Sequence, residues 1–385
     1  MLGVCGLGFA AAFFLQARGL PAGTPTYFPS GGPYDPRIKV LVLALAAACV
    51  LVVRRWTAVR DPVIAVVGVG FAFYVTNWEF VVTALVVGIA IHRWARRLPS
   101  GIAMVATAGV MFAAFMVFVP KTGNAAVNGG LAWASLRMGY YAFESKAIKK
   151  RNRSLWSLFA YAPFTVLLWP GDPPMLSYLT YTSPRPRAFL DALGGRALYR
   201  SVVKLHLFLL YDLVLRTWID GGTDTLHFGA QLIRPYIVLY LMLSASADLC
   251  TGVSNLAGYY APDAFDKPFL SMTPIHLWFR WNVHVLGFLR QAVILPIARR
   301  RRSLGLIVLA GLLASSLLHI CARPPIWNYI YWRGLPANVL VTLAFFLASV
   351  PIYLRIDRWP RSAQIASTVV TQCALVVYYR YCPVF

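Results

Sequence analysis

The run Leu304-Gly-Leu-Ile-Val-Leu-Ala-Gly-Leu-Leu-Ala-Ser-Ser-Leu-Leu-His-Ile320 decides the fold class of this chain. It holds no Asp, Glu, Lys or Arg, and a helix needs roughly 20 mostly apolar residues to cross the bilayer core. Runs of the same kind lie at residues 38–53, 102–119 and 335–354. A helix satisfies its backbone polar groups within the segment, so helices are the expected spanning elements. We therefore predict an all-α fold, a polytopic bundle of transmembrane helices.

The composition supports this prediction. Of the 385 residues, 59% are hydrophobic and 13% are charged, whereas soluble domains carry roughly 25% charged residues. The chain therefore lacks the polar surface that a water-soluble globule needs. Without a soluble linker or an obvious repeat, we expect a single integral membrane domain over residues 1–385.

A pass along the chain predicts roughly 10–13 membrane helices that enclose a catalytic tunnel. The run at residues 2–16 has no basic residue before it, which indicates a first membrane helix rather than a signal peptide. The candidate spans are 2–16, 38–53, 62–75, 79–92, 102–119, 127–144, 154–170, 202–219, 230–246, 282–297, 304–320, 335–354 and 364–380.

The net charge of +23 comes from 36 Lys and Arg residues that lie in short clusters between apolar runs. This placement follows the positive-inside rule and indicates contact with membrane lipids rather than a nucleic-acid partner. Residues 62–92 are interrupted by Asn77-Trp78-Glu79, which predicts a helical hairpin. The clusters near Arg54, Arg93 and Lys146 then share one face, which we expect to be cytoplasmic.

Irregular segments and cysteines were weighed as possible sites. Residues 173–198 are too polar to span, and residues 262–274 break the helical pattern, which is tolerated where protein or a watery cavity covers the backbone. The cysteines are scattered and suggest neither a disulfide framework nor a metal site. They are Cys5, Cys49, Cys250, Cys321, Cys373 and Cys382.

Four features, in order along the chain, carry the strongest motif. A small-residue helix starts near Asp248, and Phe265-Asp-Lys-Pro-Phe269 follows it. Next comes Leu277-Trp-Phe-Arg-Trp-Asn282, and His319 closes a later apolar helix after small residues. Together they resemble the membrane-bound O-acyltransferases, among them the bacterial alginate O-acetyltransferases and the D-alanyl transfer proteins of teichoic acid synthesis. Weaker similarities lie upstream of these motifs, so the resemblance covers roughly residues 129 to 320.

The resemblance implies an enzyme that moves an acyl group from a thioester, such as acyl-CoA, to a hydroxyl group. His319 would be the general base, since histidine accepts a proton near neutral pH. Asn282 stands where the alginate-type members have a histidine and resembles the Trp-Asn of the sterol, diacylglycerol and lysophospholipid branches. Its amide can donate to the developing oxyanion. His284, two residues on, is the alternative for this second position, and we favour Asn282.

Several neighbouring residues are candidates for substrate binding, each with a plainer alternative. Trp278 and Trp281 also suit packing or an interfacial belt. Lys267 and Arg280 suit a donor's phosphates or lipid head groups equally well, and Asp248 suits helix pairing. No Gly-x-Ser-x-Gly elbow is present, which favours direct transfer over a covalent acyl-enzyme.

The sequence thus predicts a multi-pass acyltransferase of the bacterial inner membrane. We expect it to hold no bound cofactor and to use an acyl thioester as co-substrate. The acceptor hydroxyl is left open among glycans, lipids and small metabolites. A secondary transporter is the alternative, because broken helices with midplane polar residues also occur there. A catalytically inactive membrane scaffold is the third possibility, and it would tolerate the loss of His319.

Overall fold

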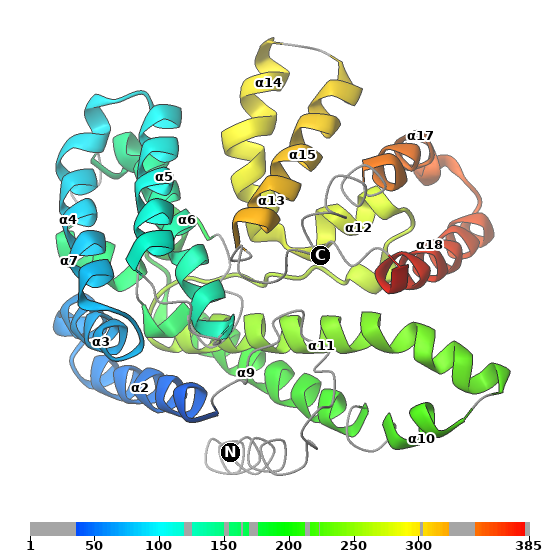
Figure 1. The fold of residues 1–385 in the computed structure, drawn as a ribbon, viewed down its shortest axis with the longest axis horizontal. Coiled ribbons are helices and arrows are strands. Elements are labelled where there is room, and N and C mark those ends of the chain that lie inside the picture. The colour runs from blue at the N-terminus through cyan, green and yellow to red at the C-terminus, as the bar shows by residue number, and fades with distance from the viewer. Residues whose placement is uncertain are drawn as a thin grey trace. The chain divides into compact units, whose positions relative to one another are not determined.

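Every regular element in the described part of the chain is a helix (Figure 1). The structure is a computed structural model, and it describes residues 36–118, 125–149, 154–162, 165–168, 176–211, 216–222, 224–300, 303–322 and 343–381. The predicted span 2–16 and the first part of the predicted span 335–354, residues 335–342, lie outside these ranges. The chain divides into two compact units, to which α9 and α11 both contribute. The all-helical class is confirmed, and the single membrane domain stays a prediction.

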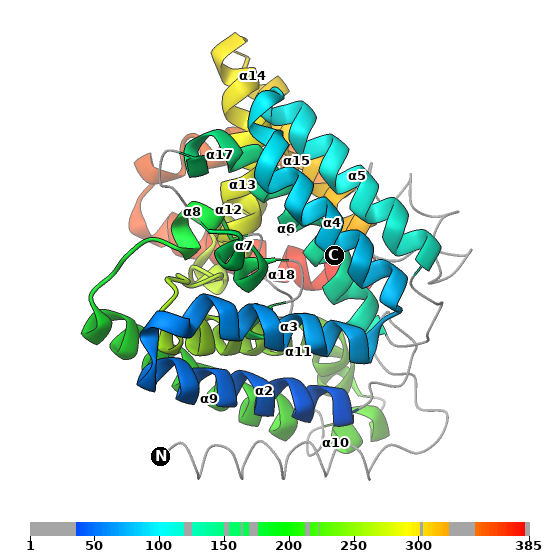
Figure 2. The same cartoon turned by 90° about the vertical axis from the view of Figure 1, so that its left-hand side faces the viewer.

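The first unit begins with helices that match the predicted apolar runs. They are α2 (Pro36–Arg55), α3 (Arg60–Val75), α4 (Trp78–Trp94), α5 (Ser100–Phe118) and α6 (Ala125–Lys149). The predicted break at Asn77 is present, because this residue has extended backbone between α3 and α4. Figure 2 shows α3 beside α2, while α4 leaves the break in another direction and runs beside α5.

Two short helices and parts of two long helices complete the first unit. They are α7 (Leu155–Tyr161), α8 (Tyr178–Tyr181), the first part of α9 (Arg187–Leu209) and the last turns of α11 (Thr225–Leu256). The buried tyrosines Tyr141 and Tyr161 meet the ring of Tyr178 edge-on. Buried Glu144 accepts hydrogen bonds from the Ser177 hydroxyl and the Leu179 amide, so its lone pairs are used.

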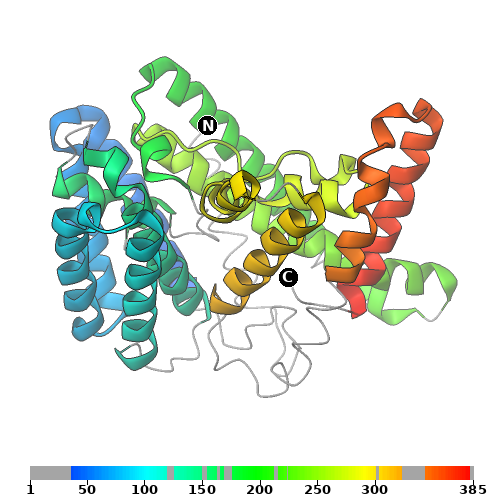
Figure 3. The same cartoon turned by 90° about the horizontal axis from the view of Figure 1, so that it is seen from above.

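The second unit is built around the first part of α11, residues 225–245, and the helices that follow α11. These are α12 (Pro274–Trp281), α13 (Val283–Leu289), a π-helical turn η6 (Arg290–Ile294), α14 (Leu295–Arg300), α15 (Leu304–Ala322), α17 (Val350–Tyr353) and α18 (Arg361–Tyr381). The short α10 (Arg216–Gly221) precedes α11. Figure 3 shows α18, in red, beside the orange helical stretch that ends in α17.

Two described helices, at Thr57–Val75 and Thr225–Leu256, are long and apolar enough to cross a membrane. A third crossing is counted if α12 and the helix after it form one broken span. Other helices also turn apolar side chains outward, such as Val82 and Val86 on α4 and Val369 on α18. Exposed apolar side chains on several helices suit contact with lipid or with protein. These features support membrane association.

Candidate functional site

The path of the chain bends sharply at Asn282. Helix α12 and the helix that begins at Val283 meet at an angle of 96°. Asn282 has non-helical backbone (φ −147°, ψ 87°), and its side-chain Oδ1 accepts a hydrogen bond from the Val285 amide. It therefore acts as the N-cap of α13, a role for which asparagine is among the best residues. Asn282 opens the predicted span 282–297, so its residue type was the signal for a cap, although no cap was predicted there.

The segment before α12 is bonded to the far end of that helix. The Asp266 amide donates to the Arg280 carbonyl at 3.0 Å, and the Val283 amide donates to the Ala264 carbonyl at 2.9 Å. Directly after Asp266, Lys267 has a positive φ of 47°, which lets the chain turn before Pro268. Two motifs that are separate in the sequence are therefore side by side in the structure.

Aromatic rings fill the space where the two motifs meet. Phe265 and Trp281 make an edge-to-face contact with ring centroids 5.5 Å apart. Tyr240 of α11 contacts both of these rings and also Phe269. Such contacts contribute about 0.5–1.5 kcal/mol each beyond the area they bury. Trp281, half-buried in this cluster, is thus a packing residue as well as a candidate for substrate binding.

Helix α15 packs against α12 through small residues. The buried indole of Trp278 donates from Nε1 to the Ser315 hydroxyl at 3.4 Å. One turn earlier, a Cβ at Gly311 would lie 3.1 Å from the Trp278 ring. Ser315 was not singled out in the sequence, although its spacing of four from Gly311 and from position 319 is the signal for one helix face. His319 lies one turn beyond Ser315 in α15, and its side chain is outside the described part.

The remaining candidates lie in different surroundings. His284 is buried in α13, two residues beyond Asn282. A guanidinium nitrogen of Arg280 is 3.5 Å from the Lys267 carbonyl oxygen, a contact at the limit of a hydrogen bond. Asp248 belongs to the other unit, where it forms an ion pair with Arg200 at 2.9 Å. That pair supplies a structural role for Asp248.

An apolar groove of about 250 Å³ adjoins the first turn of α12. Its walls come from Met272–Pro274, from the helical stretch that ends in α17, and from α18. The hydroxyls along it are engaged: Ser349 donates to the Phe346 carbonyl, and Ser367 and Thr371 both donate to the Met272 carbonyl. A groove with so few open polar groups suits hydrocarbon rather than the polar centre of a reaction.

Comparison with known proteins does not assign the chain to a family. No protein-family model matches the chain, and no curated protein matches it. In the described part of the chain, no three His, Cys, Asp or Glu side chains are grouped as metal ligands. The site is therefore judged on its residues alone.

Proposed function

We propose that this chain is a multi-pass protein of the bacterial inner membrane that transfers an acyl group from a thioester to a hydroxyl. One observation carries the proposal. The two sequence motifs on which the resemblance rests are joined by backbone hydrogen bonds at Asp266 and Val283. A functional site needs its residues close together in space, and the joining of these two motifs meets that need.

The contact between α12 and α15 supports a role for His319. Gly311 and Ser315 face Trp278, and residues four apart lie on the same side of a helix. Position 319 follows Ser315 by four residues, the spacing of one helix face, and this spacing supports the proposal that the base belongs beside the contact with α12. A histidine base typically contributes roughly 10²–10⁴ in rate.

Asn282 suits the oxyanion role because its side-chain oxygen and its side-chain nitrogen can serve different purposes. The carbonyl oxygen caps α13, while the amide nitrogen carries two N–H donors. The cap fixes the side chain at the bend, and a fixed donor needs no reorganisation when negative charge develops on the substrate oxygen. A capped helix terminus in a broken span thus serves as a rigid support for a donor.

The proposed reaction is a direct transfer. His319 takes the proton of the acceptor hydroxyl as its oxygen attacks the thioester carbonyl carbon. The carbonyl oxygen becomes an oxyanion held by the Asn282 amide. When the carbonyl re-forms, the C–S bond breaks, and the thiolate leaves with the proton from His319. The products are an O-acyl ester and a free thiol.

Release of free thiol tests the proposal directly. The purified chain in lipid nanodiscs would be given acyl-CoA together with lipid, glycan and small-metabolite extracts as acceptors. We expect thiol release that depends on one extract, a new ester detected by mass spectrometry, and a loss of roughly 10²–10⁴ in rate in His319→Ala. His206→Ala, on the exposed part of α9, is the matched control. Wild-type turnover in His319→Ala would contradict the proposal.

A secondary transporter is the second candidate, and the 96° bend at Asn282 favours it. Transporters bind substrates at discontinuous membrane helices whose termini face the ligand. Uptake of solutes into proteoliposomes separates the two functions. A transporter would accumulate a solute without releasing thiol, whereas the proposed enzyme would release thiol without solute flux.

A further inference from the structure

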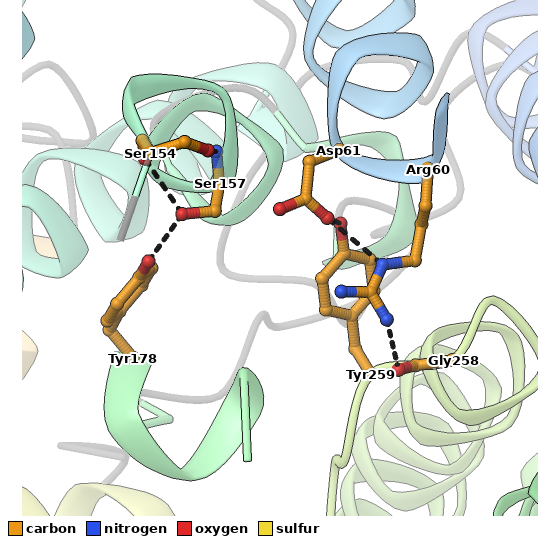
Figure 4. A network of polar contacts seen from close by, with 7 residues as sticks. All are labelled: Arg60, Asp61, Ser154, Ser157, Tyr178, Gly258 and Tyr259. Carbon is orange, nitrogen blue, oxygen red and sulfur yellow. Dashed lines mark hydrogen bonds and ion pairs between the residues drawn. The ribbon is translucent and has the colours of Figure 1, made fainter. Parts of the chain in front are cut away.

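Four arginines gather in the first unit where the turn from α2 to α3, the start of α9 and the end of α11 meet. Figure 4 shows Arg60 beside Asp61, Gly258 and Tyr259. Arg60 donates from Nε to Asp61 at 3.0 Å and from Nη1 to the Gly258 carbonyl at 2.8 Å. Its guanidinium also lies 4.3 Å from the centre of the Tyr259 ring. These contacts aim one guanidinium at the end of α11.

Arg187, at the start of α9, reaches the same place from another direction. It donates from Nη2 to the Leu256 carbonyl at 2.5 Å and pairs through Nε with Asp191 at 3.2 Å. Arg54 pairs with the same carboxylate through two contacts of 3.2 Å. Arg185 stacks its guanidinium 4.7 Å above the centre of the Tyr260 ring.

Gly258 shows how closely two of these guanidinium groups approach. A Cβ on this residue would lie 3.1 Å from Nη1 of Arg187 and 3.3 Å from Nη1 of Arg60. Both cationic nitrogens therefore converge on one point above a glycine, whose φ of +89° also disfavours any other residue there. Like charges repel, so positive charge gathered around one point favours the binding of an anion or carboxylate there.

The carboxylates nearby compensate only part of the charge. Asp61 and Asp191 supply two negative charges against the four arginines. Asp61 is already shared, because the Tyr259 hydroxyl donates to it at 2.7 Å. Burial raises the pKa of Tyr259, so this phenol remains a neutral donor and adds no negative charge. The cluster keeps an excess of positive charge.

The arginines also keep unused donors. A guanidinium has five N–H groups, and in the described part of the chain Arg60 and Arg187 each use two in hydrogen bonds or ion pairs. Arg185 has no hydrogen bond or ion pair there and lies exposed. The side chains of Arg60 and Arg187 are 30% and 38% exposed, so a ligand can reach them from solvent.

The geometry points to a binding site for a phosphate group at Arg60, Arg185 and Arg187. Guanidinium forks match the oxygens of phosphate, and several of them around one anion give the strongest charge-assisted hydrogen bonds. The rings of Tyr259 and Tyr260 stack on the guanidinium groups of Arg60 and Arg185. This stacking restricts the two side chains before a ligand binds, so binding costs less conformational entropy. The phosphate belongs to a lipid head group or to a soluble phosphorylated compound. The inference concerns the first unit and does not depend on acyl transfer.

Two probes distinguish the sources. Calorimetry with the full chain in detergent measures binding of inorganic diphosphate. Native mass spectrometry measures how much phosphatidylglycerol the chain retains relative to phosphatidylcholine. Binding of diphosphate alone assigns the site to a soluble phosphorylated compound, and retention of phosphatidylglycerol alone assigns it to a lipid head group. Either result supports the site, and both should weaken as ionic strength rises, since the arginines are partly exposed.

Variants then locate the binding. We expect Arg185→Gln and Arg187→Gln each to weaken the bound probe at least about tenfold, the range for one hydrogen bond to a charged group. Arg196→Gln, an exposed arginine of the same helix about 14 Å further along, is the matched control. Arg187→Gln also removes contacts that hold the fold, whereas Arg185→Gln removes none beyond a ring contact. Absence of binding by both probes, or equal binding by the wild type and Arg185→Gln at matched unfolding temperature, would overturn the inference.

Discussion

The indole nitrogen of Trp278 donates to the hydroxyl of Ser315 at 3.4 Å, which ties α12 to α15 inside the second unit. Both side chains are buried, at 9% and 3% exposure. A residue of the Trp-Phe-Arg-Trp motif thereby contacts the helix that carries His319. The contact is at Ser315, 37 residues further along the chain than Trp278. The geometry at this contact depends on Gly311, where the tryptophan ring occupies the space of a side chain.

Enlarging Gly311 should separate the two helices. Its Cβ would lie 3.1 Å from the Trp278 ring, so Gly311→Leu forces the ring or the helix to move. Overpacking of this kind typically destabilises by about 1–3 kcal/mol. We expect a lower unfolding temperature and reduced acyl transfer, measured by thermal unfolding and thiol release. Gly305→Ala, which meets no atom within 4 Å, is the control, and equal behaviour of the two variants would argue against the contact.

Helix positions followed from the sequence wherever apolar runs determined them. The run 38–53 became α2, and the run 304–320 became α15 with boundaries within two residues. Helix α9 was different, because it begins at Arg187 inside residues 173–198, which the sequence marked as too polar to span. Ion pairs of Asp191 with Arg54 and Arg187 stabilise that polar start. Arg54 and Asp191 are 137 residues apart, so local hydropathy cannot predict their pairing.

The sequence named candidate site residues, whose roles stay predictions, but it did not specify their local geometry. The sequence identified Asn282, Trp278 and Lys267, yet the bend at Asn282 depends on which side chain caps the next helix. The pairing of Asp248 with Arg200 likewise depends on the crossing of α9 and α11. Such contacts join distant residues, and no periodicity or motif specifies them in advance.

Lys267 should tolerate glycine. Its φ of 47° lies in the left-handed region, where a side chain other than that of glycine, asparagine or aspartate adds strain. Lys267→Gly relieves the strain but removes the charge, so we expect the unfolding free energy to stay constant or rise by up to about 1 kcal/mol. Thermal unfolding in detergent checks this. Lys267→Val should be destabilised, and a stable valine variant would show that the turn adopts another backbone conformation.

The start of α11 should loosen in acid. The backbone amide and ring of His227 bond to the exposed carboxylate of Asp224, and these hydrogen bonds lower the pKa of Asp224. A carboxyl whose pKa is lowered by folding stabilises the folded state above its unfolded pKa and loses that effect as pH falls through the folded value. Hydrogen exchange at residues 225–230 should therefore rise below about pH 4, after correction for intrinsic exchange. Asp224→Asn should remove this pH dependence, and a pH response that persists in the variant would contradict it.

Asn282 offers the sharpest separation of structure from chemistry. Its Oδ1 caps α13, and its amide nitrogen is the proposed oxyanion donor. Asn282→Ser keeps a good capping oxygen but has no amide N–H, so we expect a folded protein whose turnover falls by roughly 10²–10³, the usual loss for one oxyanion donor. Asn282→Ala should lose turnover and also about 1 kcal/mol of stability with the cap. His284→Ala should keep most of its turnover if the buried imidazole only packs or hydrogen-bonds a neighbouring helix. Turnover and unfolding temperature of all three variants at matched expression decide the assignment. Full activity in Asn282→Ser together with an inactive but folded His284→Ala would move the second catalytic position to His284.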